Sequence, residues 1–342
     1  MYIVQNSTKN HPKRNKWVGI QQKTPHFYKM NDRQIHIPTA ENFSFDECLW
    51  FLNRNFDDCM HTTGTDFIRK ALMVKGNPVL LEIRNRDQHL VIEILNGDCG
   101  QSTRNDIIQF VEDWLEPTHN IEPFYDLLQK TPELSYMTTR YAGLRLVGIP
   151  DLFEALTWSI IGQQINLTFA YRLKRRLVEN YGLPVHYHGT DYHIFPSSEI
   201  LAKAIAQDLR EMQFSEKKAE YVIGLAKVFR NGEMSKKQLQ NLADVNERYK
   251  ALTAIRGIGI WTANYALMKS LKEPSSIPHG DAGILNALIH HGIIEQKTDV
   301  AAIEKFFSKF KGWENYLVFY LWRSLAPTLA EKEISLGNIE KK

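Results

Sequence analysis

The sequence predicts an α+β protein in which a small sheet-bearing N-terminal domain precedes a mostly helical core of two lobes. Two observations carry this prediction. Alternating apolar residues are confined to residues 79–95 and to a short stretch near residue 190, whereas apolar residues spaced by three and four recur from about Arg104 onward. The length of 342 residues is enough for two or three domains, and 43% hydrophobic and 24% charged residues are typical of globular proteins.

The N-terminal part contains three kinds of segment. Residues 1–29 are polar and basic with few apolar positions, which predicts a flexible head without a fold of its own. Residues 43–55 place apolar side chains at helical spacing. Residues 79–83 and 90–95 alternate on either side of a polar turn, which predicts a β-hairpin. We therefore expect a small α+β domain over residues 30–103.

Helical periodicity dominates residues 104–342. Apolar residues at helical spacing occur in 107–114, 124–128, 152–161, 167–180, 217–229, 251–255, 261–271, 284–290, 303–310 and 316–325. A short hairpin is expected at 185–195. We expect one lobe over residues 142–273 and a second over 104–141 plus 274–342, with the active site between them.

Charge and cysteine content narrow the class of protein. Lys and Arg exceed Asp and Glu by six over residues 1–37 and by five over 131–342, whereas acids exceed bases by eight over 38–130. No apolar run could span a membrane and no signal peptide is evident, so we expect a cytoplasmic protein without membrane contact. Three cysteines, none of them after Cys99, cannot form a disulfide framework and argue against an iron–sulfur cluster.

The most distinctive motif is Arg256-Gly257-Ile258-Gly259-Ile260-Trp261. A short helix leads into a Gly-x-Gly turn and directly out into a second helix. Such glycines let the backbone approach a ligand closely, and the N–H groups at the start of the second helix suit a phosphate. Taken alone, the motif also fits an ordinary tight turn.

Three further segments stand around this motif. Asp281 follows a Pro/Gly turn and precedes an apolar helix, so local rules make it an N-cap, although a carboxylate in a cleft can also stabilise a reacting group. The segment Gly162-Gln163-Gln164 interrupts an apolar helix, where amides usually bond to backbone groups. The aromatic segment from Tyr316 to Trp322, taken alone, indicates core packing.

Together these segments resemble the helix-hairpin-helix DNA glycosylases, and within them the alkylation-repair branch of DNA-3-methyladenine glycosylase II. The resemblance covers residues 40–340, but not the basic head. It rests on Gly143-Leu144-Arg145, Asp151-Leu152-Phe153-Glu154, Ile161-Gly162-Gln163-Gln164, the hairpin motif, Asp281 and the aromatic segment. Arg256 departs from the pattern, because a proline often stands there, and we expect this to change the rigidity of the turn rather than the chemistry.

The resemblance implies roles for individual residues. Asp281 matches the catalytic aspartate, and Gln164 matches the wedge that fills the space of the extruded nucleotide. The aromatic walls of the base pocket match Trp261, Tyr265 and Trp322, with Phe51 of the small domain as a fourth.

The resemblance also implies a DNA-binding hairpin. Gly257, Ile258 and Gly259 match the turn that grips the DNA backbone. In such proteins hairpin carbonyls, here those of Thr253, Ile255 and Ile258, can hold a Na⁺ or K⁺ ion. We expect no required cofactor.

The implied function is excision of alkylated purines, such as 3-methyladenine and 7-methylguanine, from duplex DNA in base excision repair. An alkylated purine is cationic, so its bond to the sugar is already weak and one carboxylate suffices to stabilise the oxocarbenium-like sugar. Aromatic faces attract the flipped cationic base by up to about 2 kcal/mol. We expect a monomer whose partner is DNA carrying such bases, associated with the nucleoid if the source is bacterial.

Trp261 indicates whether the protein only releases the base or also cleaves the DNA strand. In strand-cutting relatives a lysine at this place forms a Schiff base with the sugar, which an indole cannot do, so we expect an abasic site without strand cleavage. Two alternatives remain: a glycosylase with associated lyase activity, and a non-catalytic lesion-binding protein, which would not need the Asp281 carboxylate.

The histidines favour no metal site. His186, His188 and His193 have a spacing that could place two imidazoles on one face of a hairpin, and His290-His291 are adjacent. We favour a polar outer face for both sets.

Overall fold

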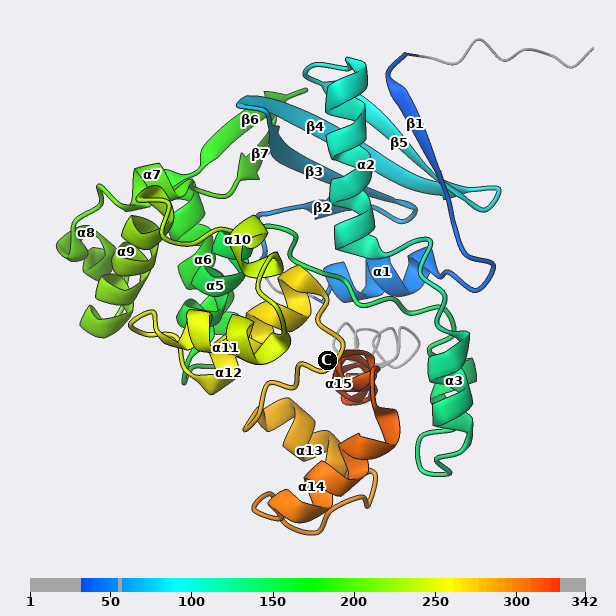
Figure 1. The fold of residues 1–342 in the computed structure, drawn as a ribbon. Helices are drawn as coiled ribbons and strands as arrows, with labels where there is room; N and C mark the ends of the chain where they lie inside the picture. Colours follow the sequence, from blue (N-terminus) through cyan, green and yellow to red (C-terminus); the bar gives the residue numbers. More distant parts are fainter. Residues whose placement is uncertain (1–31, 55–56, 327–342) are drawn as a thin grey trace, which may run out of the picture. The chain divides into compact units, whose positions relative to one another are not determined.

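A five-stranded antiparallel sheet forms the N-terminal part of the protein, with the strand order β1-β5-β4-β3-β2 (Figure 1). The computed structural model describes residues 32–54 and 57–326, so the basic head, residues 1–29, lies outside the described residues. The strands are β1 (Gln34–Pro38), β2 (Thr62–Thr63), β3 (Phe67–Val74), β4 (Asn77–Arg86) and β5 (His89–Asn96). The expected hairpin is β4 and β5.

The sequence patterns do not predict strands β1, β2 and β3. In β3, Ala71 and Leu72 are both buried although they point to opposite faces of the sheet, and the side chain of Lys70 is also buried. A strand that is buried on both faces loses the polar and apolar alternation by which strands are recognised. The other two are five and two residues long, too short for a periodic signal.

Two helices, α1 (Phe45–Leu52) and α2 (Gln101–Leu115), follow strands of the sheet-bearing part, and α2 lies across the sheet (Figure 1). The N-cap of α1, Ser44, accepts a hydrogen bond from Glu47 N, and α2 packs on β1 and β3. The expected second hairpin, β6 (Leu183–Tyr187) and β7 (Thr190–Ile194), packs on Ala71 and Leu80 of the sheet.

A helical lobe with its own core follows, and it carries the Gly-x-Gly turn. Its helices are α5 (Leu152–Gly162), α6 (Leu167–Tyr181), α7 (Ser198–Leu201), α8 (Ala206–Glu211), α9 (Glu216–Arg230), α10 (Lys236–Gln240), α11 (Val245–Thr253) and α12 (Ile260–Ala266), which continues into the π-helical turn η1 (Leu267–Leu271). Helix α5 is apolar around most of its circumference because it lies at the centre of this lobe and packs on α9 and α12.

The remaining helices pack with the sheet rather than apart from it. They are α3 (Glu122–Gln129), α4 (Met137–Arg140), α13 (Ala282–His290), α14 (Val300–Phe307) and α15 (Glu314–Ser324), with a short 3₁₀ turn η2 (Ser308–Phe310) after α14. Their buried side chains form one continuous core with those of β1, β3, β4, β5, α1 and α2. The unit expected over residues 30–103 therefore has no separate core, since helices from the far end of the chain complete it. None of the described helices is long and apolar enough to cross a membrane.

Candidate active site

The Asp281 carboxylate is held by three N–H donors from three different elements. At the N-cap of α13 its Oδ1 accepts hydrogen bonds from Ile284 N (3.0 Å) and from Trp322 Nε1 of α15 (2.9 Å). Its Oδ2 accepts one from Trp261 Nε1 of α12 (3.0 Å). The side chain is both the predicted N-cap and the centre of the predicted site, and Asp281 remains half-buried.

Two of the predicted aromatic residues bond to this carboxylate, and the third, Tyr265, lies against their rings. Trp261 and Tyr265 are four residues apart on α12, so they lie on one helix face, and their rings stack with a centroid distance of 5.2 Å and an interplanar angle of 24°. The ring of Trp322 lies 6.2 Å from that of Tyr265. Burial raises the pKa of the Tyr265 phenol, whose oxygen accepts a hydrogen bond from Trp158 Nε1 at 2.9 Å. The pocket therefore presents neutral π faces.

Phe51, the fourth predicted aromatic residue, connects to this group indirectly. Its ring centroid lies 4.8 Å from that of Phe319, which lies 6.4 Å from that of Trp322. Phe51 and Tyr265 also line one cavity, here called the inner cavity. Its aromatic lining comprises Phe51, Trp114, Trp158, Tyr171 and Tyr265, and its charged lining Arg54, Asp58, Lys70, Glu154, Lys174 and Lys269.

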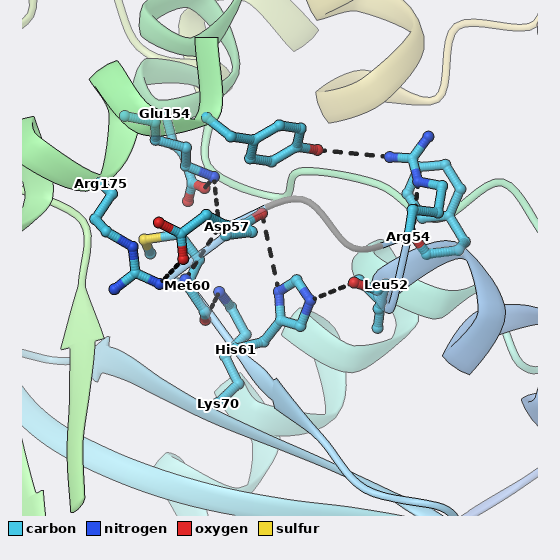
Figure 2. A network of polar contacts seen from close by, with 12 residues as sticks. Leu52, Arg54, Asp57, Met60, His61, Lys70, Glu154 and Arg175 are labelled. Carbon is cyan, nitrogen blue, oxygen red and sulfur yellow. Dashed lines mark hydrogen bonds and ion pairs between the residues drawn. The ribbon is translucent and has the colours of Figure 1, made fainter. Parts of the chain in front are cut away.

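The charged groups of the inner cavity are largely paired with one another. Lys174 Nζ lies 3.4 Å from Asp58 Oδ1 and 3.3 Å from Glu154 Oε1. Lys70 donates to Met60 O (3.1 Å), and Figure 2 shows this contact within a network that reaches from Arg54 to Arg175. Burial raises the pKa of Asp58, but the charges of Lys174, His61 and Lys70 and the hydrogen bond from Met60 N together outweigh it, so that the net pKa lies well below the usual value. The ion pair is thus formed at neutral pH.

The Gly-x-Gly turn joins α11 to α12, and its two glycines have different requirements. Gly257 has φ +94°, and a Cβ on it would lie 2.5 Å from the Tyr221 ring. Gly259 is the N-cap of α12; it makes no side-chain cap, and a Cβ there would meet open space. Between them Ile258 is buried, while the following Ile260 is exposed. Gly257 is therefore needed for folding, whereas Gly259 leaves the start of α12 accessible.

The predicted wedge, Gln164, follows α5 and is exposed, with φ +56° in the left-handed region. The neighbouring Gln163 is directed inward: its Nε2 donates to Gly257 O and to Thr262 Oγ1, each at 3.0 Å. This amide joins the wedge segment to the hairpin. Its neighbour Gly162 gave the sequence signal for a break in the helix, but the partners of Gln163 could not be read from it.

Gly283 also lies at this site, although the sequence motifs do not single it out. A Cβ on Gly283 would lie 3.0 Å from both Asp281 Oδ1 and Trp322 Cδ1, so this position is adjacent to the carboxylate and the indole at once. A glycine in the first turn of an otherwise apolar helix was the available signal, since glycine is unfavourable there without a packing reason.

The histidines do not gather around a site. His186 forms an ion pair with Asp191 on the exposed hairpin, and His291 bonds to Ser324 Oγ (2.9 Å). Within residues 32–54 and 57–326, no three His, Cys, Asp or Glu side chains are grouped so as to hold a metal ion.

Two family models together match most of the described chain. Residues 157–312 match the HhH-GPD superfamily of base excision DNA repair proteins. Residues 34–156 match the N-terminal domain of 8-oxoguanine DNA glycosylase.

Curated relatives and solved structures agree with these matches. A DNA-3-methyladenine glycosylase of Bacillus subtilis (strain 168) is 33% identical over 302 residues, which is 87% of this chain and 99% of the relative. A 3-methyladenine DNA glycosylase structure from Archaeoglobus fulgidus gives a TM-score of 0.73 at 23% identity, over 84% of this chain and 97% of that one. The 8-oxoguanine glycosylase/lyase of Clostridium acetobutylicum without DNA gives 0.67 at 17% identity, over 85% and 95%. At 23% and 17% identity, these two similarities show a shared fold.

Proposed function

The chain belongs to the DNA-3-methyladenine glycosylases of the HhH-GPD superfamily, and from this premise we propose that it excises cationic alkylated purines, such as 3-methyladenine and 7-methylguanine, from duplex DNA. As a DNA glycosylase of base excision repair it hydrolyses N-glycosidic bonds. One observation carries the finer proposal: the Asp281 carboxylate bonds to the indole N–H groups of Trp261 and Trp322 beside a stacked aromatic face.

The carboxylate geometry leaves room for one more contact. Each carboxylate oxygen has about two acceptor positions. Oδ1 of Asp281 uses two, on Ile284 N and Trp322 Nε1, whereas Oδ2 uses one, on Trp261 Nε1. The remaining position on Oδ2 is the one that would face the developing positive charge of the sugar or the attacking water.

The aromatic residues account for selection of a charged base. Trp261, Tyr265 and Trp322 offer adjacent π faces, and an indole or phenol face attracts a cation by about 0.5 to 2 kcal/mol, more when water is excluded. A neutral purine gains none of this cation attraction. The preference is therefore for charge rather than for the shape of one particular lesion.

The positions of the buried lysines support base release without strand cleavage. Lys269 follows Trp261 by eight residues, about 12 Å along a helix axis. Its amine is bonded to Val147 O, and that of Lys272 to Leu146 O. Neither amine is placed as the lysine of the strand-cutting glycosylases is, so water is the nucleophile in this proposal.

The hairpin carbonyls suit the expected Na⁺ or K⁺ ion. Ile255 O accepts a hydrogen bond from Ile258 N at 3.0 Å. The carbonyls of Thr253 and Ile258 accept none from the backbone N–H groups of the described residues, so both keep lone pairs for a cation. We propose that these three carbonyls hold the ion, which would add positive charge next to a DNA phosphate.

The decisive experiment is incubation of the protein with methylated duplex DNA, followed by analysis of released bases and strand integrity in the same sample. Asp281→Asn should abolish base release while retaining affinity for DNA that carries a transition-state mimic. Asp299→Asn is the matched control, because Asp299 is likewise an N-cap, of α14, but contacts no indole.

The outcomes separate the alternatives. Base release by Asp281→Asn at the wild-type rate would contradict the catalytic assignment. Lesion binding by the wild-type protein without base release would favour a non-catalytic binding protein.

A further inference from the structure

The inner cavity shares two aromatic residues with the predicted base pocket and adds polar groups that the proposed chemistry does not use. Tyr265 and Phe51, two residues of the predicted base pocket, line it, so a purine that reached both rings would lie beside this cavity. Four of its lining side chains are basic and two are acidic. Lys174 pairs with both acids.

Two of these basic side chains lie against Phe51. The Arg54 guanidinium is 3.8 Å from the centroid of the Phe51 ring, and the Lys269 amine is 4.8 Å from the same centroid. Arg54 also donates to Phe51 O (2.8 Å) and contacts Tyr171 OH (3.5 Å). Both side chains therefore place N–H donors at the Phe51 end of the inner cavity.

Lys269 is the more deeply buried of these two side chains. It is 2% exposed and lies four residues after Tyr265, beyond the join of α12 and η1. Its Nζ donates to Val147 O and lies 4.8 Å from the Phe319 centroid as well. Among the residues that the structure describes, no carboxylate pairs with it. Burial, together with the charges of Lys272 and Arg54, lowers the pKa of its amine well below the usual value.

A buried amine that donates hydrogen bonds is stabilised by a nearby acceptor oxygen and destabilised by nearby N–H donors. Purine lesions differ in this respect at position 6. 7-Methylguanine carries a carbonyl oxygen there, whereas 3-methyladenine carries an amino group with two N–H donors. Both bases are cationic, so their attraction to the aromatic faces is comparable and the exocyclic group distinguishes them.

We propose that Lys269 and Arg54 form a subsite at the Phe51 end of the inner cavity that binds the exocyclic carbonyl oxygen of the flipped purine. The subsite deepens the proposed function, on which it rests, because it favours 7-methylguanine relative to 3-methyladenine. Lys269 acts as a specificity-determining residue and takes no part in breaking the glycosidic bond.

The test measures both bases in one reaction. Methylated duplex DNA is incubated with each variant under single-turnover conditions, and the ratio of 7-methylguanine to 3-methyladenine release rates is determined by chromatography. Lys269→Met, which retains volume but removes the donors, should lower this ratio about tenfold, the effect of one hydrogen bond to a buried group. Lys269→Gln, which keeps N–H donors, should restore part of the ratio.

Lys70→Met is the matched control. Lys70 also lines the inner cavity, is buried, bonds to one carbonyl, Met60 O, and faces aromatic rings, those of Phe110 and Trp114. It lies against no ring of the Phe51 end, so its replacement should leave the ratio unchanged. Because the ratio is internal to each sample, a reduced folded fraction does not alter it.

The results distinguish this inference from the proposed function. An unchanged ratio in Lys269→Met, or an equal change in Lys70→Met, would overturn the subsite while base excision stands. A wild-type protein that releases neither base would overturn the proposed function itself.

Discussion

In the proposed function, Asp281 meets a structural and a chemical requirement with one side chain. The same carboxylate caps α13 through Ile284 N and receives the indole N–H groups of Trp261 and Trp322. Capping orients the carboxylate from its own helix, and the two indoles orient it from α12 and α15. A reactive group that is held from several elements is already arranged for the transition state before DNA binds.

Gly283 provides a test of this arrangement. Gly283→Ala should increase helix propensity by up to about 1 kcal/mol, yet its methyl group would press on Asp281 Oδ1 and Trp322 Cδ1, each 3.0 Å away. We expect a slower single-turnover rate of base release without loss of thermal stability. Gly224→Ala on α9 is the control, because a Cβ there has open space and should leave the rate unchanged. Equal rates for Gly283→Ala and wild type would show that the indole and carboxylate tolerate displacement.

Trp261 leads to a prediction about reaction type. The wild-type protein should yield abasic DNA that stays full length until it is treated with alkali, and borohydride should trap no covalent complex, since the indole cannot form an imine. Trp261→Lys should lose release of methylated bases, because the pocket loses a π face and gains a charge of the same sign as the base. A trapped adduct with wild-type protein would mean that another amine reaches the sugar.

At the scale of elements, the unit that contacts DNA in our proposal is α11, the Gly-x-Gly turn and α12. Gln163 ties this unit to the end of α5 through Gly257 O and Thr262 Oγ1. The neighbouring Gln164, the predicted wedge, is therefore held at a fixed place relative to the turn. Backbone grip and insertion of the wedge can then occur in one docking step.

Gly259 separates the roles of the two hairpin glycines. Gly259→Asn keeps a favourable N-cap for α12 but places a side chain where a Cβ would point into open space, so it should obstruct a phosphate. Affinity for undamaged and for lesion-bearing duplex, measured by fluorescence anisotropy, should fall by the same factor while thermal stability is retained. A loss confined to lesion-bearing DNA would instead assign the turn to lesion recognition.

At the scale of the whole molecule, Lys174 connects the sheet-bearing part to the helical lobe. It lies on α6 and pairs with Asp58, which precedes β2, and with Glu154 of α5. All three side chains are at most 15% exposed. A buried ion pair is costly to break, because removal of one partner leaves a charge without compensation.

This pairing predicts the response of stability to acid. The pKa of Asp58 is lower in the folded protein than the ~3.9 of an unfolded chain, so its contribution is present above about pH 4 and is lost as the pH falls through the folded value. Lys174→Met should lower the free energy of unfolding at pH 7 by about 3 to 5 kcal/mol and flatten its dependence on pH below 4. Urea unfolding at several pH values between about 3 and 7, a range that includes the unfolded pKa of ~3.9, measures the free energy of unfolding and its dependence on pH.

The neighbouring exposed pair supplies the comparison for that prediction. Arg175 Nη2 lies 2.5 Å from Asp57 Oδ1, and both side chains are about a third or more exposed. Arg175→Met should cost less than about 1 kcal/mol, because water already solvates these charges. Similar losses in the two variants would show that burial does not decide the strength of the Lys174 pairing.

The sequence by itself determined those features that depend on neighbours along the chain. Helical spacing located α5, α6, α9 and α15, a Pro/Gly turn before an apolar run identified Asp281 as an N-cap, and two glycines marked the turn before α12. The spacing of these motifs, through their resemblance to a family, was also sufficient to place the chain among the helix-hairpin-helix glycosylases, which the comparisons confirm.

The tertiary structure alone decided which distant groups meet. Strand β3 is buried on both faces, so it has no alternation to detect, and the core that it shares with α13 and α15 joins the first and last described parts of the chain. The contacts of Lys269 with Phe51 and Val147, and of Trp322 with Asp281, span 41 to 218 residues. Periodicity reports only which face of an element is apolar, whereas packing determines what that face touches, so the inner cavity and the donors on Asp281 could not be read from the sequence.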